Sequence, residues 1–179
     1  MKELVSQLCY SIQQEANKIQ RFLQSKESFR SDVFDQPIYY EGRQDRPEAL
    51  KGRHGVYVFL LKDDITLNEQ QVRKWNALNC GGSFKKYAEY KLSTGDCLYV
   101  GDSVSNSLYV RTGQHFAGNT TCSSLNLKHS SRNILFDHVC VWEFPIKKIF
   151  KEEEYRIILP RMEKDLHTDL EPKCGSSRV

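Results

Sequence analysis

Three short apolar runs, rich in β-branched and aromatic residues, most constrain what this chain can fold into. They are Val56–Leu61, Leu98–Val100 and Val139–Phe144. Such runs are typical of β-strands. Because side chains alternate along a strand, Tyr57 and Phe59 should face one side of the sheet, and Val56 and Val58 the other. Leu98 and Val100 should likewise share a face of the second strand. The chain is therefore expected to fold around a small β-sheet.

Helical periodicity predicts helices that cover this sheet. The predicted helices are residues 2–25, 104–117, 123–133 and 160–170. Pro160 suits the first turn of the last helix, and Pro172 stops it. The resulting order, β-β-α-(α)-β-α, predicts an α+β fold.

The composition is that of a globular protein with a mildly basic surface. Of 179 residues, 39% are hydrophobic and 27% charged, with a net charge of +3, which permits nucleic-acid binding without requiring it. The six cysteines form no CxxC pair or zinc-type spacing, so we expect reduced thiols in a cytoplasmic protein, or a nuclear one if eukaryotic. No apolar run approaches the ~20 residues of a membrane helix, so no membrane partner is expected.

We divide the chain into a helical and irregular extension, residues 1–52, and a domain, residues 53–179, with an insertion at 62–96. Within the extension, residues 26–53 are rich in Pro, Gly and Asp and contain one short extended piece, Ile38–Tyr40. The helix at 2–25 has an apolar stripe. That stripe predicts either docking on the domain or a homodimer contact.

Glu163 is a carboxylate on an apolar helical stripe, because Leu159 and Leu166 stand at i−4 and i+3 from it. A buried carboxylate needs a partner. That partner is either a nearby cation such as Arg156 or His167, or a divalent metal ion.

Four further side chains could carry chemistry. Arg111 and His115 are four residues apart, so they share one side of a helix. An arginine fork suits a phosphate, and a histidine can transfer a proton or contact that phosphate. Tyr57 and Tyr99 come close if their strands pair, and a phenol beside a cation can act as a base. Taken singly, each of these residues is better explained by packing or solvation than by catalysis.

The order of these groups along the chain resembles the GIY-YIG nuclease family. The matching stretches are Gly55-Val56-Tyr57, Leu98-Tyr99-Val100-Gly101, Arg111-Thr112-Gly113-Gln114-His115-Phe116, and Glu163-Lys164-Asp165-Leu166 through Pro172. The resemblance covers residues 53–175. It departs from the family in the long insertion, in an extra turn expected at Asp102–Ser107, and in Lys173, which follows Pro172 where the family often has Asn.

The resemblance implies a three-stranded antiparallel sheet flanked by helices, with a phosphodiesterase site on its concave face. By this resemblance, Tyr57 is the general base and Tyr99 orients water or phosphate. Arg111 stabilises charge on the phosphate, and His115 lies near that phosphate. Glu163 is the single ligand of one Mg²⁺ or Mn²⁺ ion.

The function that follows from the resemblance is a compact, restriction-like or phage-type endonuclease that hydrolyses DNA. The alternative is a catalytically inactive module that binds nucleic acid or protein on the same fold. Without a separate DNA-binding domain, such an enzyme would read DNA with its own insertions.

The insertion at 62–96 is the predicted DNA-reading element. Asn68–Leu78 predicts a helix, and the residues after it interleave lysines with tyrosines, a mixture that binds phosphates and stacks on bases. The predicted nucleic-acid contacts are Lys85, Lys86, Lys91 and Lys128. The alternative is a surface flap that packs Trp75 and Phe84 on the sheet edge.

Overall fold

The fold is given by a computed structural model that describes residues 33–43, 45–77, 91–117, 125, 127 and 135–174, the side chains of 74–77 excepted. Its elements are β1 (Ile38–Glu41), the 3-10 helix η2 (Glu48–Leu50), β2 (Gly55–Leu61), β3 (Ile65–Thr66), α2 (Glu69–Ala77), β4 (Lys91–Leu92), β5 (Cys97–Asp102), α3 (Leu108–Phe116), β6 (Val139–Pro145) and α4 (Glu152–Leu170). The predicted α+β class is confirmed.

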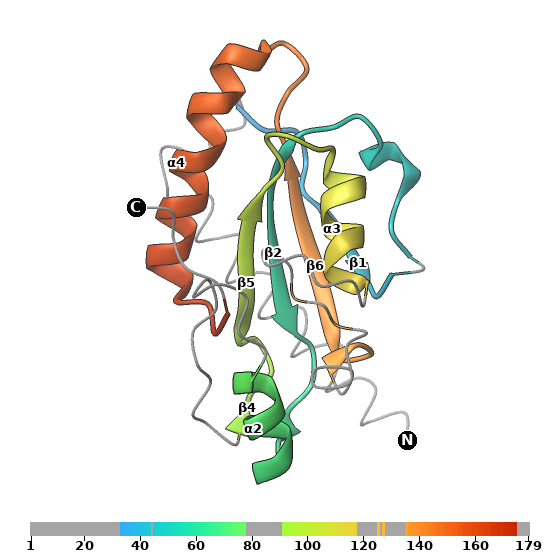
Figure 1. Cartoon of the computed structure of the whole chain (residues 1–179). Coiled ribbons are helices and arrows are strands. Elements are labelled where there is room, and N and C mark those ends of the chain that lie inside the picture. Colours follow the sequence, from blue (N-terminus) through green and yellow to red (C-terminus); the bar gives the residue numbers. More distant parts are fainter. Residues whose placement is uncertain are drawn as a thin grey trace.

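The main sheet has four antiparallel strands in the order β1-β6-β2-β5 (Figure 1). The expected three-stranded sheet is therefore wrong in strand number. Its three predicted strands do pair, with β2 in the middle. The extended piece Ile38–Tyr40 then adds a fourth strand because it hydrogen-bonds along β6, with Ile38 opposite Glu143. The segment predicted as an irregular extension thus supplies one edge of the sheet.

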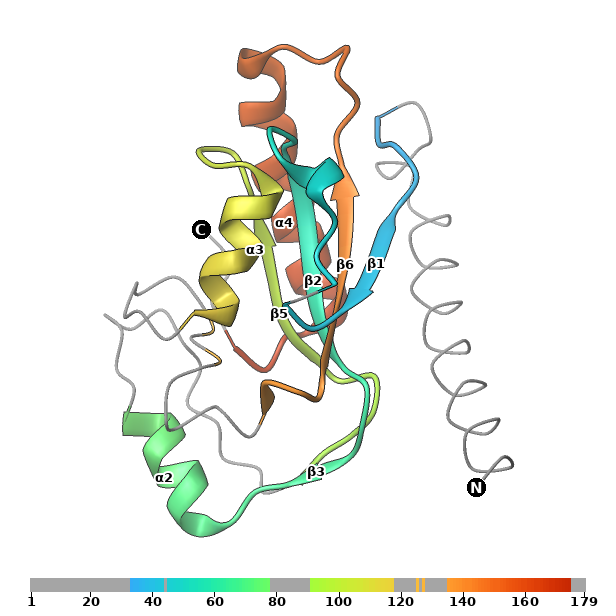
Figure 2. The same cartoon turned by 90° about the vertical axis from the view of Figure 1, so that its right-hand side faces the viewer.

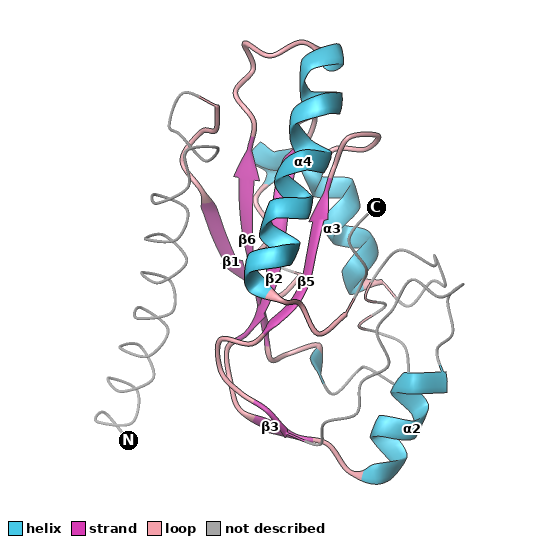
Figure 3. Ribbon diagram, turned by 90° about the vertical axis from the view of Figure 1, so that its left-hand side faces the viewer, coloured by secondary structure: helices cyan, strands magenta, loops and turns pink. Residues whose placement is uncertain are grey.

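Helices cover both faces of the sheet, so every residue of β2 is buried. Figure 2 shows α3 on one face, and Figure 3 shows α4 on the other. Tyr57 and Phe59 belong to the hydrophobic cluster beneath α3, while Val56 and Val58 belong to the cluster beneath α4. The predicted alternation along this strand is confirmed.

The second strand departs from simple alternation. Leu98 packs in the cluster beneath α3 and Val100 in the cluster beneath α4, so they do not share a face. The cause is a bulge. Phe59 of β2 pairs with Tyr99, but the next residue, Leu60, pairs with Cys97, which leaves Leu98 as the extra residue.

The last helix begins eight residues before the predicted start. Glu152 opens α4 after Lys151, whose backbone N–H is bonded by the Glu154 side chain at 2.7 Å. Three glutamates in the first turn also interact favourably with the positive N-terminal end of the helix dipole. Pro160 therefore lies inside the helix and not in its first turn. Glu171, in the left-handed region with φ 45°, ends the helix before Pro172.

The helix expected at 104–117 begins later, at Leu108. Residues 104–106 are bends, and the Ser107 hydroxyl accepts the N–H of Val110 as the helix cap. In place of the turn expected at Asp102–Ser107, Asp102 ends β5 and bends at 104–106 lead into the helix.

The insertion starts and ends as a small antiparallel ladder, β3 with β4, and α2 lies within the helix predicted at Asn68–Leu78. The predicted helices at 2–25 and 123–133 lie outside the described residues, apart from the isolated positions 125 and 127. Cys97, Cys140 and Cys174 are buried thiols, as expected. In the described part of the chain, no helix has both the length and the apolar character needed to span a membrane.

Candidate functional site

The Tyr57 phenol lies across the edge strand of the sheet. Its strand neighbour in register is Gly101 of β5. A Cβ on Gly101 would overlap the phenol oxygen and lie 2.5 Å from Tyr57 Cζ, so only glycine leaves room for this ring. Gly101 is therefore needed to make room for the Tyr57 ring.

His115 is bonded to protein groups through both ring nitrogens. The backbone N–H of Leu125 donates to Nδ1 at 2.9 Å, and Nε2 lies 2.9 Å from the Tyr57 oxygen. Because Nδ1 accepts a hydrogen bond, neutral His115 carries its own hydrogen on Nε2 and directs it to the Tyr57 oxygen. Burial, aided by Arg111, holds the pKa of His115 well below its usual value, so the ring is neutral at pH 7.

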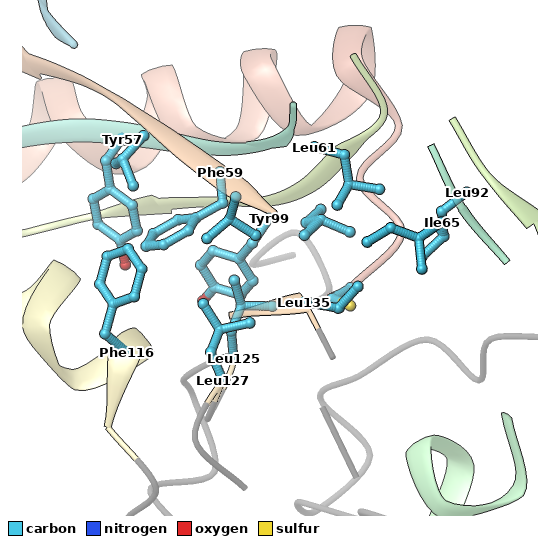
Figure 4. Packing of buried hydrophobic residues seen from close by; sticks show 14 of the residues in the cluster. Tyr57, Phe59, Leu61, Ile65, Leu92, Tyr99, Phe116, Leu125, Leu127 and Leu135 are labelled. Carbon is cyan, nitrogen blue, oxygen red and sulfur yellow. The ribbon is translucent and has the colours of Figure 1, made fainter. Parts of the chain in front are cut away.

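Tyr99 completes an aromatic group beneath α3. Its ring centroid is 6.2 Å from that of Tyr57 in a stacked arrangement and 4.5 Å from that of His115. Figure 4 shows the Tyr57, Phe59 and Tyr99 side chains on one face of the sheet, and the Phe59 ring packs against Phe116 with centroids 5.4 Å apart. Tyr57 and His115 are 0% exposed and Tyr99 is 8% exposed.

Arg111 is the half-buried member of the group. It comes from the same helix as His115, and its Nη1 donates to the Gln114 side chain at 2.9 Å. Burial alone would lower the pKa of the guanidinium, but the Tyr57 and Tyr99 phenols outweigh it and leave that pKa raised. Arg111 is therefore a fixed positive charge beside the two phenols.

Glu163 reaches the group from α4, on the other face of the sheet. It is 5% exposed, and Leu159 and Leu166 beside it are fully buried, which confirms the predicted stripe. Its carboxylate is close enough to raise the pKa of Tyr57. Arg156, one expected partner, instead pairs with Glu152 at 2.6 Å.

Burial dominates the acidity of Tyr57. It raises the pKa of the phenol well above its ordinary value of 10.0, and the neighbouring Tyr99 adds to the rise. Arg111 acts in the opposite direction. In this environment Tyr57 is a protonated phenol, and further positive charge would be needed to make it a base near neutral pH.

Sequence reasoning missed Asp102. This residue ends β5 directly after the Tyr99-Val100-Gly101 tripeptide and is 5% exposed. Its carboxylate raises the pKa of both Tyr57 and Arg111. Its position was the available signal. Asp102 is an acidic residue at the end of the strand that carries Tyr99, so it had to lie near the candidate site.

The predicted nucleic-acid contacts are less well defined. Lys91 lies in β4 and is exposed, while Lys85, Lys86 and Lys128 lie outside the described residues. A cleft of about 730 Å³ lies elsewhere, beside the first turn of α3. It is lined by Glu41, Gly42, Arg43, Asp45, Arg46, Lys62, Tyr109, Phe136 and Asp137, so none of the five predicted site residues faces it.

The donor set suits a hard cation. Within the described ranges, no three His, Cys, Asp or Glu side chains gather where they could hold a metal ion between them. Glu163 offers carboxylate oxygens beside a phenol, and Mg²⁺ commonly takes one or two carboxylates together with waters and substrate phosphate. Glu163 is thus a carboxylate that could hold such an ion together with waters.

Comparison of the chain with family models, with curated proteins and with solved structures finds no match in any of the three. What defines the class of this protein is its own architecture. It is an α+β protein in which strands β2 and β5 and helices α3 and α4 bring together two tyrosines, an arginine, a histidine and two carboxylates.

Proposed function

We propose that this protein is a divalent-metal-dependent endonuclease of the GIY-YIG kind, which hydrolyses DNA phosphodiester bonds. The observation that supports this most is the convergence of Tyr57, Tyr99, Arg111, His115 and Glu163. They come from four separate elements, and their electrostatic and ring contacts link them into one group. Packing alone does not require an arginine and a carboxylate beside a buried phenol.

Each residue has a role that its surroundings support. Arg111, half-buried and always charged, binds the phosphate oxygens and stabilises the charge that builds up as water attacks phosphorus. Tyr57 in its ionised form takes the proton of the attacking water as the P–O bond to the leaving oxygen breaks. The His115 Nε2–H donates to the Tyr57 oxygen and so stabilises that ionised form.

Glu163 would hold the cation. A bound divalent ion supplies Lewis-acid stabilisation of the phosphate and lowers the cost of ionising nearby groups. Because Tyr57 is fully buried, side chains that cover it must shift before a phosphodiester reaches it. His115, with both nitrogens engaged, supports Tyr57 and does not contact the phosphate.

The test is nicking of supercoiled plasmid with Mg²⁺ or with EDTA. The wild-type protein should nick only with the metal ion. Glu163→Gln, which keeps the side-chain shape but removes the charge, should lower the rate by roughly 10²-fold or more and weaken Mn²⁺ binding measured by electron paramagnetic resonance. Glu153→Gln, at an exposed position of the same helix, is the matched control and should change neither.

Wild-type rates in Glu163→Gln would refute the metal-ligand role. DNA binding by wild-type protein without any cleavage, under all divalent ions tried, would instead favour the alternative, an inactive binding module on this fold.

A further inference from the structure

A second buried polar cluster lies beside Tyr57, on the β1 side of α3. Its centre is Glu143 of β6, which is 0% exposed and pairs in register with Tyr57 of β2. The Tyr40 hydroxyl donates to Glu143 Oε1 at 2.5 Å. Burial raises the pKa of Glu143 from 4.5 to about 7, against the opposing effects of Tyr40, Thr112 and Arg46.

Arg46 bridges this cluster to α3. Its guanidinium carbon lies 3.9 Å from the centre of the Tyr109 ring, a cation–π contact. The same carbon lies 3.0 Å from where a Cβ of Gly113 would stand, and Nη1 is closer still. Tyr109 and Gly113 are one helical turn apart, so Arg46 lies along one side of α3.

Gly113 is explained by this contact. Glycine inside a helix costs about 0.5–1 kcal/mol relative to alanine, which is why it weakens a sequence-based prediction of α3. Here Arg46 occupies the space that a side chain at position 113 would fill. Any larger residue at position 113 would push the guanidinium away from the helix.

The Arg46 guanidinium is not placed there for stability alone. Its Nε and Nη1 atoms are buried and form no hydrogen bond, and the Glu143 Oε2 atom is in the same condition. The two side chains do attract each other electrostatically, as the lowering effect of Arg46 on the pKa of Glu143 indicates. Buried charged atoms without hydrogen-bond partners commonly stabilise a fold no more than an apolar replacement would, so another role is needed to explain Arg46.

That role follows from what α3 carries. Gly113 lies midway between Arg111 and His115, the two helix residues of the candidate site. We propose that Arg46, braced by Glu143, is a positioning residue that fixes α3 over the sheet and thereby holds His115 and Arg111 in line with Tyr57. As a positioning role, this proposal rests on the proposed nuclease function. The contact itself can be tested without activity.

The experiment compares Arg46→Gln, Arg46→Lys and Lys51→Gln with the wild-type protein. Lys51 is the matched control, because its Nζ also lies near the Tyr109 ring, at 5.1 Å, but its side chain is exposed and paired with Glu48. For each variant, three quantities are measured: the single-turnover nicking rate at saturating enzyme, the dissociation constant for DNA, and the ¹⁵N chemical shifts of the His115 ring.

Arg46→Gln should lower the nicking rate by roughly ten- to a hundred-fold, since small misplacements of reacting groups have effects of that size. DNA affinity should change by less than about threefold. The His115 Nε2 signal should move as its bond to Tyr57 loosens. Arg46→Lys should restore part of both effects, and Lys51→Gln should match the wild type.

Unchanged His115 shifts in Arg46→Gln would overturn the proposal whatever the rates. So would a loss of DNA affinity with a wild-type rate, since Arg46 would then bind DNA directly. If the wild-type protein cleaves nothing, the nuclease function fails, and the positioning of α3 is judged on the His115 shifts alone.

Discussion

Burial and charge act in opposite directions at Tyr57, and their balance decides what this residue can do. Burial and Tyr99 raise the pKa of the phenol, and Arg111 lowers it. Arg111 thus has two tasks in the proposed reaction: it binds phosphate, and it makes the ionised form of Tyr57 less costly. A lysine could keep the charge but not the planar two-point contact with phosphate.

Arg111→Ala is therefore expected to lower the single-turnover cleavage rate by about 10²- to 10³-fold. The melting temperature should fall much less than the rate, because Arg111 is half-buried and its bond to Gln114 joins residues of one helix. Arg156→Ala, which breaks an exposed pair with Glu152, is the control and should leave the rate unchanged. If Arg111→Ala mainly lowers the melting temperature, Arg111 is a structural ion-pair partner and not a phosphate ligand.

At the scale of elements, the local sequence pattern predicted most features that depend on interactions within one strand or helix. The alternation of β2 and the stripe around Glu163 were readable, because one buried face imposes a period on the sequence. The prediction from Pro160 was wrong, because the start of α4 is set by Lys151, Glu154 and an acidic first turn. The helix continues through Pro160 although a proline there removes one i→i−4 hydrogen bond. The β5 bulge was not readable either, since it depends on the pairing register with β2.

The parts of the site that could not be predicted are those made by tertiary contact. Nothing in the sequence around Glu143 or Arg46 indicates that both lie beside α3. β1 brings Tyr40 to Glu143, and η2 follows Arg46, yet this segment reads as irregular. Pairing between strands a hundred residues apart leaves little local trace.

Glu143 gives a prediction for the sheet and α3 together. Tyr40, Arg46 and the Thr112 hydroxyl face it, and Tyr57 lies on the neighbouring strand. Its folded pKa of about 7 exceeds its ordinary 4.5, so the folded state binds the proton more tightly. Between these two values, stability falls as pH rises, by about 3 kcal/mol in total, and above pH 7 the whole loss is present.

Glu143→Gln mimics the protonated carboxyl at every pH. The variant should match the stability of the wild-type protein near pH 4.5 and exceed it at pH 8, by up to about 3 kcal/mol. Urea unfolding at both pH values measures this difference, and Glu48→Gln, at an exposed position, is the control. A variant that is less stable than the wild type at pH 8 would show that the ionised Glu143 stabilises the fold.

In the whole molecule, the candidate site lies near the β5 edge of the sheet, and β1 forms the opposite edge. A duplex has two antiparallel strands, and a nuclease with one such site must either rebind or act as a symmetric pair. The apolar stripe predicted for residues 2–25 is suited to a two-fold contact, because such interfaces need a self-complementary apolar patch.

We therefore expect the full-length chain to be a dimer in light scattering and a chain lacking residues 1–26 to be a monomer with the same melting temperature. The dimer should convert supercoiled plasmid to the linear form with little open-circle intermediate, while the truncated chain should accumulate the nicked form. Equal monomer masses for both chains would discard the dimer and leave the helix docked on its own domain.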